Sequence, residues 1–303
     1  MMTIARYADL ICDAGGCAKN YRRRPTNSAD PWYVWVRGDQ LPQFVEMVAP
    51  KLLRRYILVS GSDDRGPLRM LGETGLVGIL NSTRLVHWFA EAADFVHPKL
   101  DAVPTGLWPR HITQALRLHE LRERRVLTPI ERPLTVLCAF RVESNHPSRL
   151  AAERFCQASS LADATLMQSG RQPQGALDPQ AYQSMRNATH DAMARHAFVL
   201  CPLGVGLGSH RFTEALLLGS IPIVFRSTLD AMYESMGVAA VINHVDEITE
   251  ANLKDWVARF NPQFESRTGA PQATQAYWHA RIFSARNLSA NRSDIDTGIA
   301  KIK

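Results

Sequence analysis

A cluster of glycines followed by polar residues is the part of this sequence best suited to chemistry. Three glycines stand at alternate positions, and a serine, a histidine, an arginine and a glutamate follow them: Gly204, Gly206, Gly208, Ser209, His210, Arg211 and Glu214. Glycines allow backbone N–H groups to come close to an anion, and the first turn of a helix favours negative charge. Because basic side chains are otherwise unfavourable in that turn, His210 and Arg211 indicate that an anion such as a diphosphate binds there.

Glu214 lies one turn beyond Arg211, so the two side chains share a helix face. A carboxylate at that depth can accept hydrogen bonds from the hydroxyl groups of a ribose or another sugar. The alternative is a structural ion pair between Arg211 and Glu214 on a surface helix. The sequence leaves both interpretations open.

The elements around this cluster form a supersecondary unit. Residues 197–201 are a short apolar run that predicts a buried strand, and Ser209 stands where a helix N-cap is expected. Residues 211–218 have the apolar spacing of a helix with one buried face, Gly219 ends that helix, and residues 221–225 predict a second strand. This order is a βαβ unit of a parallel sheet, whose ligands bind at the carboxyl edge of the strands.

The first half of the chain has the same predicted order of strand, helix and strand. Two aspartates follow the second strand, at the carboxyl edge of the predicted sheet. Residues 32–36 and 56–60 predict strands, and residues 41–53 between them have helical periodicity. Asp63 and Asp64 follow in the loop after the second strand. A carboxylate there can take the proton from a hydroxyl group that attacks a sugar, which makes both aspartates candidate catalytic residues. A turn stabilised by the two aspartates is the alternative.

Two arginines follow the first predicted strand of the second half. Residues 134–140 form an apolar run, Arg141 comes directly after it, and Arg149 begins the next predicted helix. Guanidinium groups beside the glycine cluster can bind a diphosphate through paired hydrogen bonds, which lysine does less well. Exposed surface arginines without a ligand are the alternative.

Length and composition predict two folded units. The 303 residues suit two domains of about 130 to 150 residues, and 46% apolar residues with 21% charged residues exclude a disordered chain. Prolines bracket a polar stretch at residues 124–133, where we place the linker. The predicted fold is α/β, with two Rossmann-like parallel-sheet domains that face a cleft: residues 1–127, residues 128–282 and a C-terminal tail of residues 283–303.

The net positive charge indicates which kinds of ligand or surface this protein can bind. The charge of +6 suits an anionic ligand, an acidic glycan or a membrane surface, but the basic residues are scattered along the chain. The sequence contains no zinc-finger spacing and no ribonucleoprotein signature, so no nucleic-acid partner is predicted. No apolar run approaches the ~18 residues that span a bilayer, and the first residues lack the apolar core of a cleavable signal. We therefore expect no transmembrane segment, and at most a peripheral membrane contact.

The five cysteines indicate whether the protein's compartment is reducing or oxidising. Their number is odd, and Cys138 and Cys201 fall in predicted buried strands, where a thiol behaves as a small apolar group. Unpaired cysteines favour a reducing compartment. The sequence therefore predicts a cytoplasmic protein.

Several of these motifs occur together in an order that resembles a known enzyme family. Residues 198–202 read FVLCP, Gly204-x-Gly206 and His210-Arg211-x-x-Glu214 follow, and residues 219–224 read GSIPIV. This order and spacing resemble the donor-site signature of the exostosin-like glycosyltransferases, a family with the GT-B fold. The resemblance implies a two-domain enzyme that moves a sugar from a UDP- or GDP-sugar to a glycan or another hydroxyl acceptor. It also implies inversion at the anomeric carbon and a nucleotide held by the C-terminal domain.

The resemblance assigns roles to single residues as well. Arg149 is the preferred phosphate contact because the family has an arginine in this region, and Arg141 is the alternate. Asp64 matches the acid of a Ser-Asp pair in the family better than Asp63 does. Within residues 1–282, the two predicted domains, no Asp-x-Asp motif is present. We therefore expect no metal ion and no other cofactor, with positive side chains in the place of the metal.

Two other functions stay open. Val205 and Gly208 differ from the residues usual in the family's loop, which is compatible with a catalytically inactive protein that binds a nucleotide or a carbohydrate. A Rossmann-type oxidoreductase is less favoured, because the glycine cluster lacks the G-x-G-x-x-G spacing. Hydrolysis of a nucleotide-sugar without an acceptor separates an enzyme from a pure binding protein.

Overall fold

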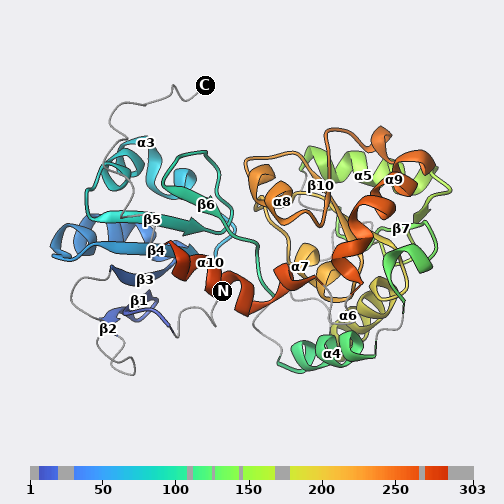
Figure 1. The fold of residues 1–303 in the computed structure, drawn as a ribbon, viewed down its shortest axis with the longest axis horizontal. Coiled ribbons are helices and arrows are strands. Elements are labelled where there is room, and N and C mark those ends of the chain that lie inside the picture. The colour runs from blue at the N-terminus through green and yellow to red at the C-terminus, as the bar shows by residue number, and fades with distance from the viewer. Residues whose placement is uncertain are drawn as a thin grey trace.

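The structure is a computed structural model of the chain, and it describes residues 7–19, 31–107, 112–124, 127–142, 146–167, 178–265 and 270–285. Two sheets dominate the described residues: one of six strands from the first half of the chain and one of five strands from the second half. Figure 1 shows the two sheets in the two halves of the structure, with helices packed around each. The predicted α/β class with mostly parallel sheets is confirmed.

The first sheet begins with a hairpin and continues in parallel. Its strands are β1 (Leu10–Asp13), β2 (Gly16–Lys19), β3 (Trp32–Arg37), β4 (Tyr56–Gly61), β5 (Leu85–Ala90) and β6 (Leu100–Ala102). Their order across the sheet is β2-β1-β3-β4-β5-β6; β1 and β2 are antiparallel, and the other four neighbouring pairs are parallel. β4 is buried along its whole length, as expected for a parallel strand covered on both faces. The strands predicted at residues 32–36 and 56–60 are confirmed as β3 and β4.

The helical segment between β3 and β4 is more broken than its periodicity predicts. It consists of α2 (Leu41–Gln43), a π-helical turn (Phe44–Val48) and a 3-10 turn (Ala49–Lys51). Pro50 is one physical reason, since proline has no N–H group to donate to the preceding turn. Beyond β4, α3 (Pro67–Leu80) leads to β5.

The second sheet is parallel throughout its described pairs. Its strands are β7 (Val136–Leu137), β8 (Ala162–Asp163), β9 (Phe198–Cys201), β10 (Ile221–Phe225) and β11 (Ala240–Ile242), in the order β11-β10-β9-β7-β8. The helices of this half are α4 (Ile112–Glu123), α5 (Pro147–Ala158), α6 (Pro179–Met193), α7 (His210–Leu217), α8 (Asp230–Met236) and α9 (Glu250–Phe260).

The central βαβ unit of this sheet agrees with the sequence. β9, α7 and β10 follow one another, and β9 and β10 pair in parallel. Ser209 is the N-cap of α7, because its hydroxyl oxygen accepts the N–H of Arg211 at 3.2 Å. Gly219 has a φ of 74°, which suits a glycine that ends a helix. The strand predicted at residues 134–140 is shorter than expected, since β7 pairs with its neighbours over two residues.

Arg132 anchors the segment that the sequence predicts as a linker. Its side chain is 4% exposed. One guanidinium nitrogen donates to the carbonyl of Met193 at 3.2 Å, and the other donates to the carbonyl of Leu218 at 2.9 Å. These carbonyls lie at the C-terminal ends of α6 and α7, where a cation is favourable. The segment before the second sheet is therefore fixed to that sheet's helices.

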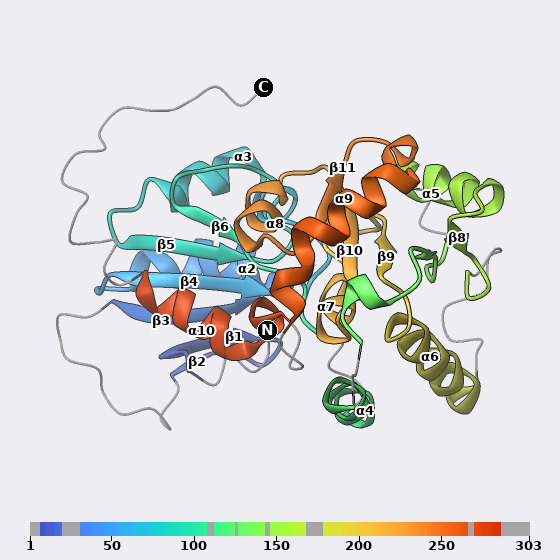
Figure 2. The ribbon, with the colours of Figure 1, turned by 45° about the vertical axis from the view of Figure 1, so that its right-hand side comes forward.

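Helix α10 (Gln275–Ser284) returns to the first sheet. The ring of Phe283 lies 4.2 Å from the ring of Tyr33 between centroids, and the Tyr33 hydroxyl donates to the Phe283 carbonyl at 3.3 Å. Figures 1 and 2 both show α10 lying against the strands of the first sheet. The predicted domain end at residue 282 therefore falls inside a helix that packs on the first half.

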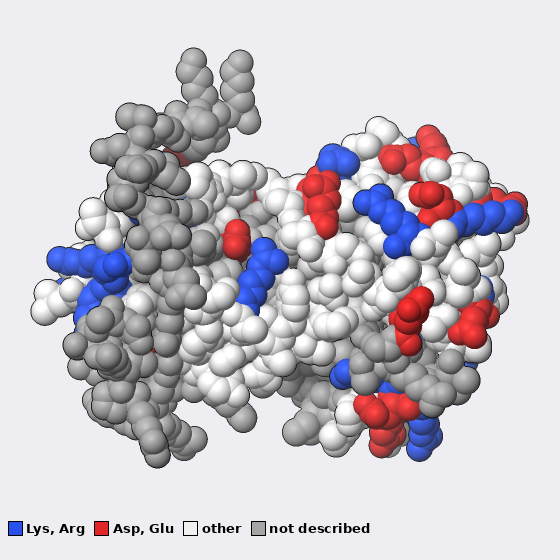
Figure 3. All heavy atoms as spheres, in the orientation of Figure 1, with Lys and Arg blue, Asp and Glu red and all other residues white. Residues whose placement is uncertain are grey.

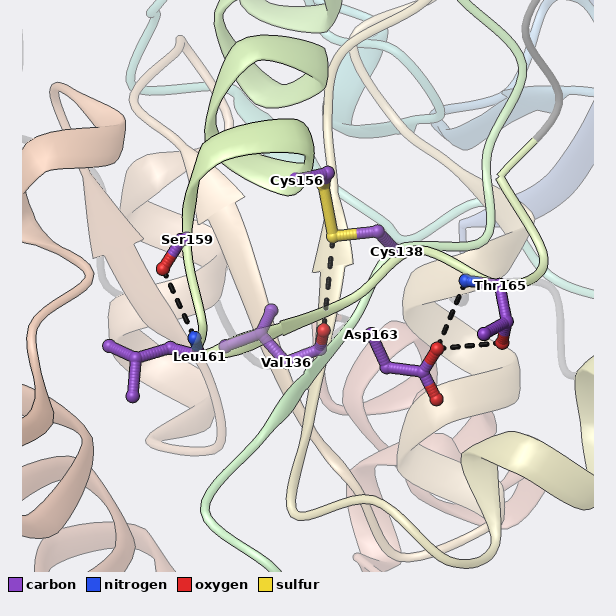
Figure 4. The surroundings of a disulfide bond; sticks show 7 residues. All are labelled: Val136, Cys138, Cys156, Ser159, Leu161, Asp163 and Thr165. Carbon is purple, nitrogen blue, oxygen red and sulfur yellow. Dashed lines mark hydrogen bonds between the residues drawn. A yellow bond between two sulfur atoms is a disulfide. The ribbon is translucent and has the colours of Figure 1, made fainter.

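The cysteines are paired differently from the sequence prediction. Cys12 and Cys17 form a disulfide across the β1–β2 hairpin, where they lie opposite each other. Cys138, just after β7, is joined to Cys156 on α5 (Figure 4). The prediction of an unpaired Cys138 was wrong, because α5 packs its Cys156 side against the sheet. Cys201 is a buried free thiol, as predicted. Since disulfides form in oxidising compartments, a cytoplasmic location no longer follows from the cysteines.

Thiol titration tests this pairing. We expect no reaction of the native protein with Ellman's reagent, because burial raises the pKa of the Cys201 thiol to about 12. Unfolding without a reductant should expose one thiol per chain, and unfolding after reduction should expose all five. Three or five thiols in the unfolded, unreduced protein would contradict the two disulfides.

Charged side chains of both signs are mixed on the surface. On the face shown in Figure 3, lysines and arginines lie interspersed with aspartates and glutamates over the half that contains the second sheet. This distribution agrees with the scattered basic residues in the sequence. Among the described residues, no helix has both the length and the apolar character needed to cross a membrane.

Candidate functional site

The strand order of the second sheet singles out one position at its carboxyl edge. After β7 the chain passes through α5 to β8 on one side, whereas β9 lies on the other side and leads through α7 to β10. The neighbouring strands β7 and β9 therefore form a switch point, the place where open α/β sheets bind their ligands. The helices that follow these two strands carry Arg149 and Arg211.

Arg149 reaches from α5 to the glycine cluster. Its Nε donates to the carbonyl of Leu203 at 2.8 Å, and its guanidinium group also donates to the carbonyl of Arg141. A Cβ at position 204 would lie 2.6 Å from the Arg149 guanidinium, so Gly204 leaves the space that this side chain occupies. Burial lowers the pKa of Arg149, and the positive charge of Arg211 lowers it further. Arg149 thus lies within the electrostatic influence of Arg211.

Arg141, the predicted alternate phosphate contact, supports Arg149 through its main chain. It is half-buried just after β7, and its backbone carbonyl accepts the hydrogen bond from Arg149. The main chain of Arg141 therefore helps to hold the Arg149 side chain in place.

Glu214 lies at the centre of a buried charge cluster. One carboxylate oxygen accepts a hydrogen bond from Arg211 at 3.0 Å, and the other accepts one from Arg186 on α6. His190 Nε2 lies 3.7 Å from the second oxygen. Because Glu214 is 1% exposed and both oxygens face arginines, its carboxylate orients Arg211 from inside the fold. The ion pair of Arg211 and Glu214 that the sequence left open is present, but it is buried and shared with Arg186 instead of lying on a surface helix.

The cluster controls the charge of Glu214. Burial alone raises the pKa of this carboxyl group. The charges of Arg211 and Arg186, together with the nearby His190, outweigh burial and bring the pKa to about 2. Glu214 is therefore ionised at neutral pH and neutralises part of the positive charge beside it.

The glycine cluster contacts loops of the first sheet. A Cβ at Gly206 would lie 2.8 Å from the carbonyl oxygen of Asp64, and a Cβ at Gly208 would lie 2.4 Å from the Thr105 hydroxyl. Asp64 follows β4, and Thr105 follows β6. Glycine at positions 206 and 208 thus allows the carboxyl edges of the two sheets to meet, a role that the sequence analysis did not foresee.

Substitution in this loop tests the close approach. Gly206→Ala is expected to lower the free energy of unfolding by about 1 to 3 kcal/mol, because the new methyl group meets a backbone atom that must shift. Val205→Ala is the matched control, since Val205 is 66% exposed in the same loop and should change stability by less than about 0.5 kcal/mol. Urea unfolding measures the stability of both variants. If Gly206→Ala were as stable as Val205→Ala, the close contact between Gly206 and Asp64 would be contradicted.

His210 is tied to the first half of the chain. Its Nδ1 contacts the carbonyl oxygen of Gly106, and because a carbonyl only accepts, Nδ1 carries the proton. One turn along α7, the Thr213 hydroxyl donates to the Thr105 carbonyl at 2.6 Å. Burial lowers the pKa of His210, although its hydrogen bond to Gly106 and the charges of Glu214 and Asp64 act in the opposite direction. The histidine predicted to contact phosphate is thus also a link between the two halves.

The two candidate catalytic aspartates have different surroundings. The Asp63 carboxylate accepts the backbone N–H and two guanidinium N–H groups of Arg65, each at 2.9 Å, and the hydrogen bond from Arg65 lowers its pKa. This is the turn-stabilising role that the sequence left open. Asp64 is exposed beside the glycine cluster, and its charge raises the pKa of both Glu91 and His210. The backbone of Asp64 therefore lies against the glycine cluster, whereas the Asp63 carboxylate is held by Arg65.

Glu91 is a further carboxyl group at this junction that the sequence analysis missed. It comes directly after β5 and is 7% exposed. Its Oε2 accepts the N–H of Ser62 at 2.5 Å, and the backbone N–H of Gly106 acts with Ser62 to lower the pKa of this carboxyl group against the effect of burial. The available signal was an acid directly after the largely apolar residues 85–90, a position like those of Asp63 and Asp64 after residues 56–60.

Three further observations concern parts of the chain outside the glycine cluster. A pocket of about 410 Å³ lies at the outer edge of the first sheet, against β1 and β3, with Leu10, Trp32, Met47 and Lys51 among its lining residues. Among the described residues, no group of three or more His, Cys, Asp or Glu side chains is arranged to hold a metal ion. The sequence also contains Asp294-Ile295-Asp296 in the predicted tail, outside the described residues.

Comparison with models of protein families, and with curated protein sequences, finds no match to this chain.

Proposed function

We propose that this chain is a glycosyltransferase that moves a sugar from a nucleoside-diphosphate donor to a hydroxyl group of a glycan or another acceptor. The sequence motifs from residue 198 to residue 224, which resemble those of exostosin-like glycosyltransferases, support the sugar donor. One structural observation supports the diphosphate most strongly: Arg149 and Arg211 come from either side of the switch point of the second sheet. Their charges act on each other, and a bound diphosphate would relieve the repulsion.

In this proposal the arginines act on the leaving group. As the bond between the sugar and the diphosphate breaks, negative charge grows on the diphosphate, and guanidinium groups held in place beforehand stabilise that charge. Leu203 holds Arg149, and Glu214 holds Arg211, so neither side chain has to reorganise during the reaction.

Asp64 is the proposed base. Transfer to a hydroxyl group requires removal of its proton as the new bond forms, which a carboxylate can do. Asp64 lies on the first half of the chain and meets the glycine cluster of the second half. We therefore assign the donor to the second sheet and the acceptor to the first, in a GT-B arrangement that uses arginines where other enzymes use a metal ion. Inversion at the anomeric carbon is what the family resemblance implies.

A panel of UDP- and GDP-sugars tests the proposal. We expect release of UDP or GDP from at least one donor, slowly in water and faster with a hydroxyl acceptor. Arg149→Ala should remove this activity, and Arg154→Ala is the matched control, because Arg154 is an exposed arginine on the same helix. Binding of UDP or GDP without turnover of any donor would favour the inactive binding protein instead. Absence of both binding and turnover would refute the proposal.

A further inference from the structure

Glu91 joins two loops that lie on opposite sides of β5. The first loop follows β4 and contains Ser62 and Asp64, and the second follows β6 and contains Gly106. Ser62 donates its backbone N–H to Glu91 Oε2 at 2.5 Å, and the backbone N–H of Gly106 lowers the pKa of the same carboxyl group. One buried side chain thus connects the carboxyl ends of three neighbouring strands.

The backbone around Glu91 adopts conformations that are costly for residues with side chains. Ser62 has a φ of 63° and Ala92 has a φ of 48°, both in the left-handed region. Gly61 is also constrained, because a Cβ there would lie 2.7 Å from Glu91 Oε2. Such local strain persists where the surrounding structure holds it and is concentrated at functional sites. Contacts of the carboxyl group with Ser62 and Gly61 help to maintain this geometry.

The hydrogen bonds continue from Glu91 to both sides of the proposed active site. Asp64, the proposed base, lies two residues after Ser62. Gly106, whose backbone N–H lowers the pKa of Glu91, accepts a hydrogen bond from His210 on α7 through its carbonyl. Loss of the carboxyl group would release the Asp64 loop and the Gly106 turn together.

We propose that Glu91 is a positioning residue of the active site. It fixes the loop that contains Asp64 and the turn at Gly106 that contacts His210. This inference rests on the proposed glycosyltransferase function. Burial raises the pKa of Glu91 and the charge of Asp64 adds to the rise, whereas the two backbone N–H groups favour the ionised form. Glu91 acts through Asp64 and His210 and is not assigned a contact with the substrate.

Two variants of Glu91 test the proposal. Glu91→Ala should lower kcat for sugar transfer by about 100-fold, because a misplacement of about 1 Å in a reacting group has an effect of that size. Binding of UDP or GDP should stay within about twofold, since Arg149 and Arg211 are untouched. Glu91→Gln keeps one carbonyl oxygen as an acceptor and should recover part of kcat. Amide hydrogen exchange should become faster at residues 61–66 and 103–107 in the alanine variant.

Asp94→Asn is the matched control. Asp94 also accepts two backbone N–H groups, those of Leu68 at 2.8 Å and Arg69 at 2.9 Å, but it caps α3 and does not bridge the two loops. It should lower the unfolding temperature while kcat is retained. A folded Glu91→Ala protein with wild-type kcat would overturn the positioning role and leave the proposed function intact. A wild-type protein without turnover of any donor would instead refute the proposed function, and this inference with it.

Discussion

Replacing Arg211 with alanine is expected to lower the turnover of a UDP- or GDP-sugar by about 100- to 1000-fold, the usual effect of removing one donor that stabilises transition-state charge. The physical reason is the fixed position of this guanidinium group. Glu214 holds it at 3.0 Å from inside the fold, and Arg211 lies in the first turn of α7, the helix that follows β9 at the switch point. Steady-state kinetics with a donor and an acceptor measures the effect.

The lysine variant separates charge from geometry. Arg211→Lys keeps the positive charge but loses the planar pair of N–H donors, so we expect most of the activity to be lost here as well. Arg154→Ala, on the exposed side of α5, should leave kcat and the donor KM unchanged. Unfolding curves of all three variants are needed, because Arg211 also neutralises the buried Glu214. Full activity of a folded Arg211→Ala protein would show that Arg211 does not stabilise the leaving diphosphate.

Replacing Glu214 with glutamine is expected to lower the free energy of unfolding by about 3 to 5 kcal/mol at pH 7, the typical cost of breaking a buried ion pair. Arg186 and Arg211 would then be left with a neutral amide between them. The exposed Glu234 offers a control, since Glu234→Gln should change stability by less than about 0.5 kcal/mol.

The same variant should change the response to acid. The pKa of Glu214 is lowered to about 2 from an ordinary value of 4.5, so its ionised form stabilises the fold at pH values above 4.5. That contribution falls as the pH decreases from about 4.5 toward 2, because the unfolded chain takes up the proton first. Urea unfolding at pH 7 and pH 3 should therefore show a smaller difference between wild type and Glu214→Gln at pH 3. A difference independent of pH would contradict the ionised cluster.

Local patterns in the sequence were sufficient to predict the central unit of the second sheet. Short apolar runs, a capping serine and a terminating glycine determine β9, α7 and β10 through interactions between residues close in sequence. The length of β7 was not predictable in this way, because the extent of a strand depends on the partners that it meets in the sheet.

The site itself was predictable only in part. The sequence identified Arg149, Arg211 and Asp64 by their places after predicted strands. It did not show that Arg186 on α6 binds Glu214, or that Cys138 pairs with Cys156, because helix packing brings these partners together.

Close contacts between the halves explain the remaining differences. Gly206 and Gly208 look like anion-binding glycines in sequence, but their neighbours in space are Asp64 and Thr105 of the first half. Glu91 gave little sequence signal, since its role depends on two loops that meet only in the folded chain. Contacts of this kind are set by tertiary structure and not by local spacing.

A crystal structure of the protein with UDP or GDP tests the central claim most directly. We expect the diphosphate to lie between the guanidinium groups of Arg149 and Arg211, at the carboxyl ends of β7 and β9. Nucleotide bound elsewhere on the molecule, or a site between these arginines that stays empty at saturating nucleotide, would contradict it.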